Sequence, residues 1–200
     1  RKAAQIEERL NEDHGAAKTY HQLGTLAVER GDLDKAEDWY RRSREIKERL
    51  GDEHGAAMTY HELGVTHQLR RNLEEAEKWY RKATEIKERL GDEHGVAQTY
   101  HQLGRVAEER RDFEKAENWY RRSVEIGKRL GDKEGVAQTY HQLGITAQGR
   151  GDFKEAANWY RKALEIKEHL GEEQEMGKTY HQLGRTAQKQ REWKQAEEWY

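Results

Sequence analysis

The stretch Thr19-Tyr20-His21-Gln22-Leu23-Gly24, with Ala36 and Trp39-Tyr40 shortly after it, decides the fold because it recurs. The same residue types return every forty residues, over 59–80, 99–120, 139–160 and 179–200. Self-similarity at a fixed period of this size is typical of solenoids, in which each repeat buries its apolar face against its neighbours. The chain is therefore expected to offer a long surface rather than an enclosed pocket.

Each repeat predicts two helices separated by a turn. In the first repeat, apolar residues recur at helical spacing over 15–30 and again over 33–50, with Gly31-Asp32 between them. The expected N-caps of the second helices are Asp32, Asn72, Asp112, Asp152 and, as a weaker cap, Glu192. The second helices are expected to stop at Gly51-Asp52, Gly91-Asp92 and Gly131-Asp132.

A glycine in the middle of each first helix indicates a close helix crossing. Gly24 and its equivalents each cost about 1 kcal/mol relative to alanine, and Ala36 occupies the matching place on the second helix. The cost recurs at Gly64, Gly104, Gly144 and Gly184. We therefore expect the two helices of each repeat to approach each other there.

One pattern runs through the first repeat: Tyr20, Leu23-Gly24, Ala27, Gly31-Asp32-Leu33, Ala36, Tyr40 and Ser43. It resembles the tetratricopeptide repeat, in which Trp or Tyr-x-x-Leu-Gly precedes Ala-x-x-x-Phe or Tyr-x-x-Ala. The usual unit has about 34 residues and a proline after its second helix, whereas this unit has 40 residues and the chain has no proline. In its length it is similar to the repeats of kinesin light chains, of Leu-Gly-Asn-repeat adaptors and of bacterial regulators.

The resemblance implies an all-α fold, a right-handed α-solenoid of helix-turn-helix repeats. A single solenoid over residues 1–200 is expected, with half a second helix and a loop of a preceding repeat over 1–14. Complete repeats would then cover 15–54, 55–94, 95–134 and 135–174, and a truncated repeat 175–200. The additional residues, such as 48–53, should lengthen each second helix by about one and a half turns.

Composition excludes several classes of function. The 37 Lys and Arg residues balance 39 Asp and Glu residues, so no net field favours nucleic acid or an anionic membrane. Acidic and basic residues alternate on the second helices, where four i,i+4 ion pairs are expected: Glu37–Arg41, Glu77–Arg81, Glu117–Arg121 and Glu125–Arg129. The chain has no cysteine and no long apolar run. These features are typical of a soluble, cytoplasmic protein.

Tetratricopeptide arrays bind peptides or protein segments on a concave groove lined by their first helices, and the resemblance implies such a groove here. Three positions per repeat are its expected ligand-binding residues. They are Lys18, His21 and Thr25; Met58, His61 and Val65; Gln98, His101 and Arg105; Gln138, His141 and Ile145; and Lys178, His181 and Arg185. A fourth position on the same face holds Val28, Gln68, Glu108, Gln148 and Gln188.

The third groove position varies more than the packing positions do. It holds Thr25, Val65, Arg105, Ile145 and Arg185, which differ in size, polarity and charge. Buried sites accept few alternatives, so this variation indicates exposure. Selective recognition of a ligand and free drift of a solvent-facing position both account for it.

The groove histidines form a series with one member per repeat, His21, His61, His101, His141 and His181. A structural hydrogen bond to the neighbouring repeat, contact with a ligand backbone, pH sensing near the ordinary pKa of about 6.5 and metal binding are the alternatives. Metal binding is disfavoured because no Cys, Asp or Glu recurs beside the series to complete a ligand set.

Motifs for catalysis are absent, so we predict no enzymatic activity, no cofactor and no metal site. His61-Glu62 begins like a zinc protease motif, but Val65 stands where the second histidine is required. The carboxylate clamp of some family members uses Lys, Arg and Asn, whereas the recurring residues here are Gln22, Glu62, Gln102, Gln142 and Gln182. Lys178, Arg185 and Arg105 favour an acidic protein segment instead.

Both ends of the sequence fall within second-helix patterns, and joining Tyr200 to Arg1 would continue the repeat. Natural arrays normally end in polar capping repeats. We therefore expect either a piece of a longer array or an engineered, near-consensus sequence, and head-to-tail self-association through uncapped ends. The alternative function is accordingly a structural self-assembly module without an evolved ligand.

Overall fold

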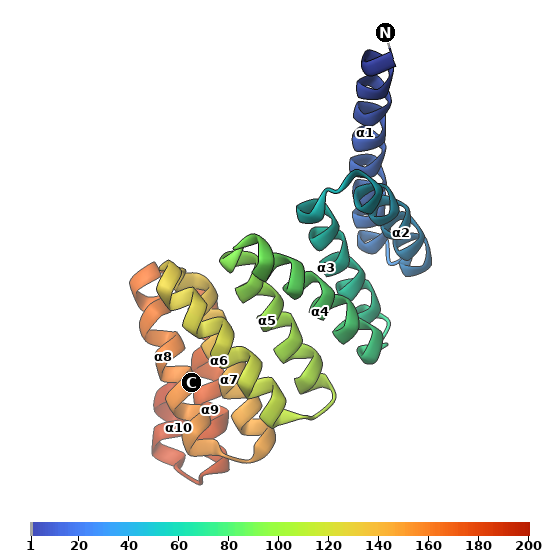
Figure 1. The fold of residues 1–200 in the computed structure, drawn as a ribbon. Coiled ribbons are helices and arrows are strands. Elements are labelled where there is room, and N and C mark those ends of the chain that lie inside the picture. Colours follow the sequence, from blue (N-terminus) through green and yellow to red (C-terminus); the bar gives the residue numbers. More distant parts are fainter. Residues whose placement is uncertain (1) are drawn as a thin grey trace. The chain divides into compact units, whose positions relative to one another are not determined.

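The computed structural model describes the backbone of residues 2–200 and the side chains of residues 12–200. All regular structure in this described part is helical, as Figure 1 shows. The elements are α1 (Lys2–Glu29), α2 (Leu33–Leu50), α3 (Glu53–Leu69), α4 (Leu73–Leu90), α5 (Glu93–Glu109), α6 (Phe113–Leu130), α7 (Lys133–Arg150), α8 (Phe153–Leu170), α9 (Glu173–Lys189) and α10 (Trp193–Trp199). The all-α, paired-helix architecture predicted from the repeat is confirmed.

The helices pack as consecutive pairs. Each first helix lies against the second helix that follows it, and further packing joins α2 to α3, α6 to α7 and α8 to α9. The chain divides into two compact units, residues up to Asp92 and Glu93–Tyr200. In the first unit the buried core centres on Tyr40, Tyr60 and Leu63, and in the second on Tyr120, Leu143 and Tyr160.

The glycine in each first helix permits a close approach, as predicted, and its partner is a tyrosine ring. A Cβ atom at Gly24 would lie 2.6 Å from the Tyr40 ring, and one at Gly64 would lie 2.6 Å from the Tyr80 ring. Tyr40 and Tyr80 are both 0% exposed. Ala36 is fully buried as well, but the glycine accommodates the aromatic side chain.

The expected helix ends are largely confirmed. Asp32, Asp112 and Asp152 accept hydrogen bonds from the third backbone N–H beyond them. Gly51, Gly91 and Gly131 adopt the left-handed conformation after the second helices. Glu192, expected to cap weakly, makes no side-chain cap hydrogen bond.

Three sequence predictions need correction. Asn72 makes no side-chain cap hydrogen bond, although asparagine is as common an N-cap as aspartate. Arg129 pairs with Glu93, at 2.8 Å, and its expected pair with Glu125 does not form. The loop expected within residues 1–14 is absent, since α1 is continuous and Asn11 and Glu12 replace the glycine and aspartate of the other turns.

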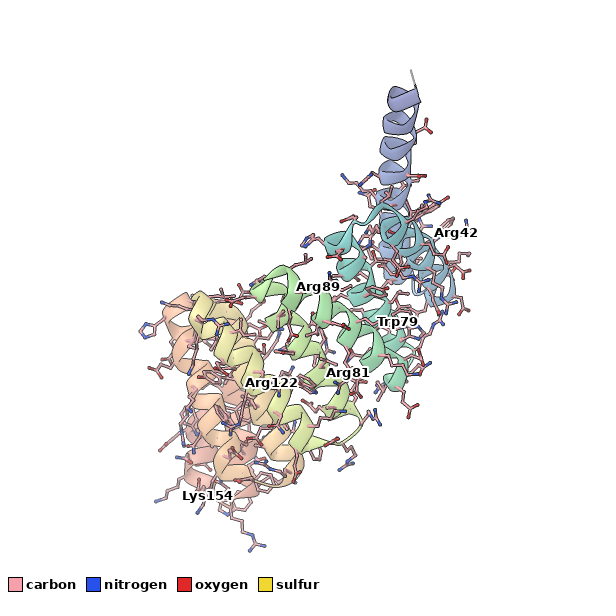
Figure 2. The ribbon with its side chains drawn as sticks, in the orientation of Figure 1. Arg42, Trp79, Arg81, Arg89, Arg122 and Lys154 are labelled. Carbon is pink, nitrogen blue, oxygen red and sulfur yellow. The ribbon has the colours of Figure 1, made fainter. Side chains whose placement is uncertain are left out.

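The second helices carry charged outer faces. Arg41, Arg81 and Arg121 form the expected i,i+4 pairs with Glu37, Glu77 and Glu117. Figure 2 labels two basic side chains of these helices, Arg81 on α4 and Arg122 on α6. Leu90, Leu130 and Leu170, which end the apolar stripes, are at least 40% exposed. The stripe is therefore buried only up to the last turn of each second helix.

Candidate ligand-binding groove

The predicted groove residues lie on the first helices, and most of their side chains reach solvent. The first position is exposed in every repeat, at Lys18, Met58, Gln98, Gln138 and Lys178. At the third position Thr25, Arg105 and Arg185 are exposed, while Val65 and Ile145 are half-buried. The histidines at the second position are half-buried, except for the exposed His181. We call this side of the first helices the groove face.

The histidine series is tied to the protein on two sides. Each ring lies against the second-helix tyrosine of its own repeat, with ring centroids 5.2 Å apart for His141 and Tyr160. His141 Nδ1 lies 3.3 Å from Thr179 Oγ1 on the next first helix. His21 makes the same contact with Thr59, and His101 with Thr139. The structural hydrogen bond to the neighbouring repeat is thus one role of these histidines.

A buried lysine joins this network, as Lys47 and Lys167 show. Lys167 Nζ donates to Thr179 Oγ1 at 3.2 Å and to the carbonyl oxygen of Glu175 at 3.3 Å. Lys47 donates in the same way to Thr59 and Gly55. Our sequence reasoning missed these lysines, which are only 3% and 9% exposed. Their place on the Ala36, Tyr40 and Ser43 stripe, four residues after Ser43 or the equivalent Ala163, was the available signal.

The hydrogen bonds of this network determine which ring nitrogen of His141 carries the proton. The Thr179 hydroxyl has one proton, which it donates to the Glu175 carbonyl oxygen at 2.9 Å. The hydroxyl therefore accepts from both Lys167 and His141, so Nδ1 of His141 carries the ring proton. Nε2 is left as an acceptor that can receive an N–H from a ligand backbone.

Burial keeps four of the groove histidines uncharged at neutral pH. Burial, with a smaller contribution from a nearby cation, lowers the pKa of His21, His61, His101 and His141 to about 4. That cation is Lys167 for His141 and Arg105 for His101. A switch near the ordinary histidine pKa is therefore not expected. Within residues 12–200, no group of three or more metal-ligating side chains could hold a metal ion.

Three predicted groove residues meet at one cleft in the second unit. The cleft lies between α7 and α9 and has a volume of about 590 Å³. It is lined by Glu134, Gln138, His141, Gln142, Lys167, Glu172, Glu175 and Lys178. Glu175 lies 2.5 Å from Lys178 Nζ and 3.6 Å from Lys167 Nζ. The lining thus offers amide, imidazole and ion-paired groups but few apolar ones.

The fourth position of the groove face is largely committed to internal hydrogen bonds. Gln68 accepts from the Tyr80 hydroxyl at 3.0 Å. Glu108 accepts from the Tyr120 hydroxyl at 3.0 Å and from Thr146 at 3.2 Å. Gln148 donates to Thr186 Oγ1 at 2.6 Å. These side chains hold second helices and neighbouring repeats in place.

The paired helices and the recurring close approaches define a helical repeat protein. The Tetratricopeptide repeat family model matches residues 1–49, 55–129, 96–169 and 136–200. The chain therefore belongs to the tetratricopeptide repeat family. Domains of this family bind proteins and are generally non-catalytic.

Solved structures share the fold at low sequence identity. BtubC (BKLC) from P. vanneervenii is 22% identical over 97% of this chain and 87% of its own, with a TM-score of 0.82. The apo form of RapI is 18% identical over 92% of this chain and 67% of its own, with a TM-score of 0.85. A putative kinesin light chain from Podosopora anserina with nearly identical TPR-like repeats is 20% identical over 96% and 91%, with a TM-score of 0.72.

No curated protein sequence matches this chain significantly. In the described part of the chain, no helix combines the length and the apolar character needed to cross a membrane.

Proposed function

We propose that the chain is a non-enzymatic scaffold that binds an extended protein segment along its groove face. The observation that carries the proposal is the cleft between α7 and α9, which brings together Gln138, His141 and Lys178. Each of these residues was predicted from its place in the repeat. Their chemistry suits a peptide, because Nε2 of His141 accepts a backbone N–H and the Gln138 amide can both donate and accept.

Selectivity would come from the third groove position. In the second unit this position holds Arg105 on α5, Ile145 on α7 and Arg185 on α9. Arginine recognises carboxylates by paired hydrogen bonds, and the half-buried Ile145 offers an apolar contact. The expected ligand is therefore a protein segment with acidic side chains on either side of an apolar one.

The test is a comparison of groove and control variants. The groove variant carries alanine at Arg105, Ile145 and Arg185, and the control carries alanine at three exposed second-helix residues, Glu114, Lys154 and Arg161. Partners are captured from a lysate, the contacting segment is mapped by cross-linking, and a synthetic peptide of that segment is titrated calorimetrically. We expect the peptide to bind the unmodified chain and the control variant but not the groove variant. Equal binding by all three, with unchanged melting, would contradict it.

A second candidate is the self-assembly module. One observation favours it: Trp193 and Tyr200 are 62% and 59% exposed in the last helix pair, whereas the equivalent Tyr160 is fully buried. A second copy of the chain could cover these aromatic side chains in a head-to-tail contact. Sedimentation should then show association that rises with concentration and weakens in Trp193→Ser. A concentration-independent monomer excludes this candidate.

A further inference from the structure

A second cleft in the Glu93–Tyr200 unit lies away from the groove face. It is formed by the end of α6, the start of α7 and the second half of α8, and its volume is about 490 Å³. On α7 it uses Lys133, Val136 and Tyr140, whereas the groove face uses Gln138, His141 and Ile145. Because Gly127 is part of its lining, we call it the Gly127 cleft.

The end of α6 departs from the other second helices at this cleft. Residue 127 is glycine, whereas the equivalent residues of α2 and α8 are the buried Lys47 and Lys167. Their long side chains fill the space between a second helix and the next first helix. At Gly127 there is no such side chain, and even a Cβ atom would lie only 2.8 Å from Val136. Val136 therefore packs directly against the backbone at residue 127 and forms part of the cleft floor there.

The next residue reverses a charge. In the equivalent turns a glutamate of the second helix accepts a hydrogen bond from the following first-helix tyrosine. Glu48 accepts from the Tyr60 hydroxyl, and Glu168 from the Tyr180 hydroxyl at 3.2 Å. Lys128 stands at this position beside Tyr140. Because an ammonium group cannot accept, the Tyr140 hydroxyl makes no hydrogen bond to any side chain among residues 12–200.

A second cation faces the same tyrosine. Lys128 Nζ lies 5.5 Å and Lys162 Nζ 5.8 Å from the centre of the Tyr140 ring. Neither ammonium group forms an ion pair with a carboxylate in the part of the chain whose side chains are described. Two cations near one ring repel each other, and an anion between them would offset this repulsion.

The rim of the cleft is also less acidic than the rim of the equivalent turn in the first unit. In the first unit Glu53 pairs with Arg89 at 2.6 Å. The equivalent positions beside the Gly127 cleft hold Lys133 and His169. The lining thus contains Lys128, Lys133 and Lys162 against two carboxylates, Asp132 and Glu165. Its floor is apolar, formed by Val136, Ile166 and the Tyr140 ring.

We propose that the Gly127 cleft binds an acidic side chain of a partner protein, together with an apolar side chain next to it. The ligand carboxylate takes the place that Glu48 and Glu168 occupy in the other turns. It accepts a hydrogen bond from the Tyr140 hydroxyl and pairs with the ammonium groups of Lys128 and Lys162. The apolar neighbour covers Val136 and Ile166. This site is independent of the groove face and of the function proposed for it.

The proposal is tested with two blocked peptides, acetyl-Leu-Glu-Phe-amide and its glutamine twin, acetyl-Leu-Gln-Phe-amide. Binding is followed by amide chemical shifts in NMR spectra of the full chain. We expect the glutamate peptide to shift the signals of Gly127, Gly131 and Val136 and to bind at least about tenfold more tightly than its twin, since only a carboxylate pairs with the lysines. Inorganic phosphate, titrated separately, distinguishes recognition of the peptide from binding of any anion.

Variants separate this site from general charge effects. Lys128→Glu restores the residue found at positions 48 and 168, so the variant should fold normally. Its affinity for the glutamate peptide should fall by at least about tenfold. Lys154→Glu makes the same charge change at an exposed residue near the start of α8, labelled in Figure 2, and should leave binding unchanged. Equal binding of both peptides, no shift up to their solubility limit, shifts confined to the groove face, or tighter binding of phosphate than of the glutamate peptide would each overturn the proposal.

Discussion

His141 and Lys167 hydrogen-bond to one hydroxyl group, that of Thr179, at 3.3 Å and 3.2 Å. This single oxygen joins a first helix, the second helix that follows and the next first helix. In the third repeat the arrangement is simpler, because Gly127 replaces the lysine: Thr139 Oγ1 contacts His101 at 3.0 Å and donates to the Gly135 carbonyl oxygen at 2.8 Å. The two threonines therefore form a natural comparison.

Thr179→Val should destabilise the chain more than Thr139→Val does. Both variants remove a histidine contact and a hydrogen bond to a backbone carbonyl oxygen, but only Thr179→Val also removes an acceptor from a buried ammonium group. We expect losses of about 2 and about 1 kcal/mol in the free energy of unfolding. Urea denaturation with unchanged m-values checks this order. Equal losses would show that the lysine bond contributes nothing.

Acid should weaken the fold through the histidine series. The pKa of His101 is about 4 in the folded chain and about 6.5 when unfolded, so unfolding between these values takes up a proton. The stability that this histidine contributes is complete above pH 6.5 and is lost as the pH falls toward 4. His101→Gln should reduce the slope of unfolding free energy against pH there by up to about 1.4 kcal/mol per pH unit. Denaturation of both proteins across this range measures the slopes, and identical slopes refute the prediction.

Gly104→Ala should be destabilising although alanine is the better helix former. The new Cβ atom would lie 2.5 Å from the Tyr120 ring, which is fully buried and bonded through its hydroxyl to Glu108. Overpacking should exceed the propensity gain and leave a net cost of about 1–2 kcal/mol. The matched control is Gly177→Ala in α9, where no atom lies within 4 Å and a gain of up to about 1 kcal/mol is expected. Thermal melts of the two variants should therefore shift in opposite directions.

Asn72→Asp should stabilise α4. The backbone at Asn72 resembles that at Asp112, but only the aspartate accepts a cap hydrogen bond. A carboxylate at residue 72 should add this bond and a favourable interaction with the helix dipole, together about 0.5–1 kcal/mol. Asp112→Asn should lose a comparable amount. If neither variant changes the melting temperature, the cap hydrogen bond does not contribute to the stability of the chain.

The repeat made much of the fold predictable. The helix pairs, the glycine turns and the groove residues all follow from residue types that return every forty positions. The missed features depend on contacts and substitutions that the repeat pattern alone does not show. Lys47 was not recognised as buried because lysine usually reaches solvent, and its burial depends on acceptors that the following helix supplies. The continuity of α1 follows from the absence of glycine at residue 11. The prediction of a loop there relied on the repeat pattern and did not take this difference into account.

By itself, the sequence determined the helical period, the pairing of helices and which residues occupy the groove face, because these depend on local spacing along the chain. Only the tertiary structure decided that the histidines are held by threonines of the next repeat, that Glu108 is bound by two hydroxyl groups, and that Lys128 faces Tyr140 where other turns place a carboxylate. The physical reason is that burial, hydrogen bonding and charge pairing depend on which side chains of neighbouring repeats come into contact.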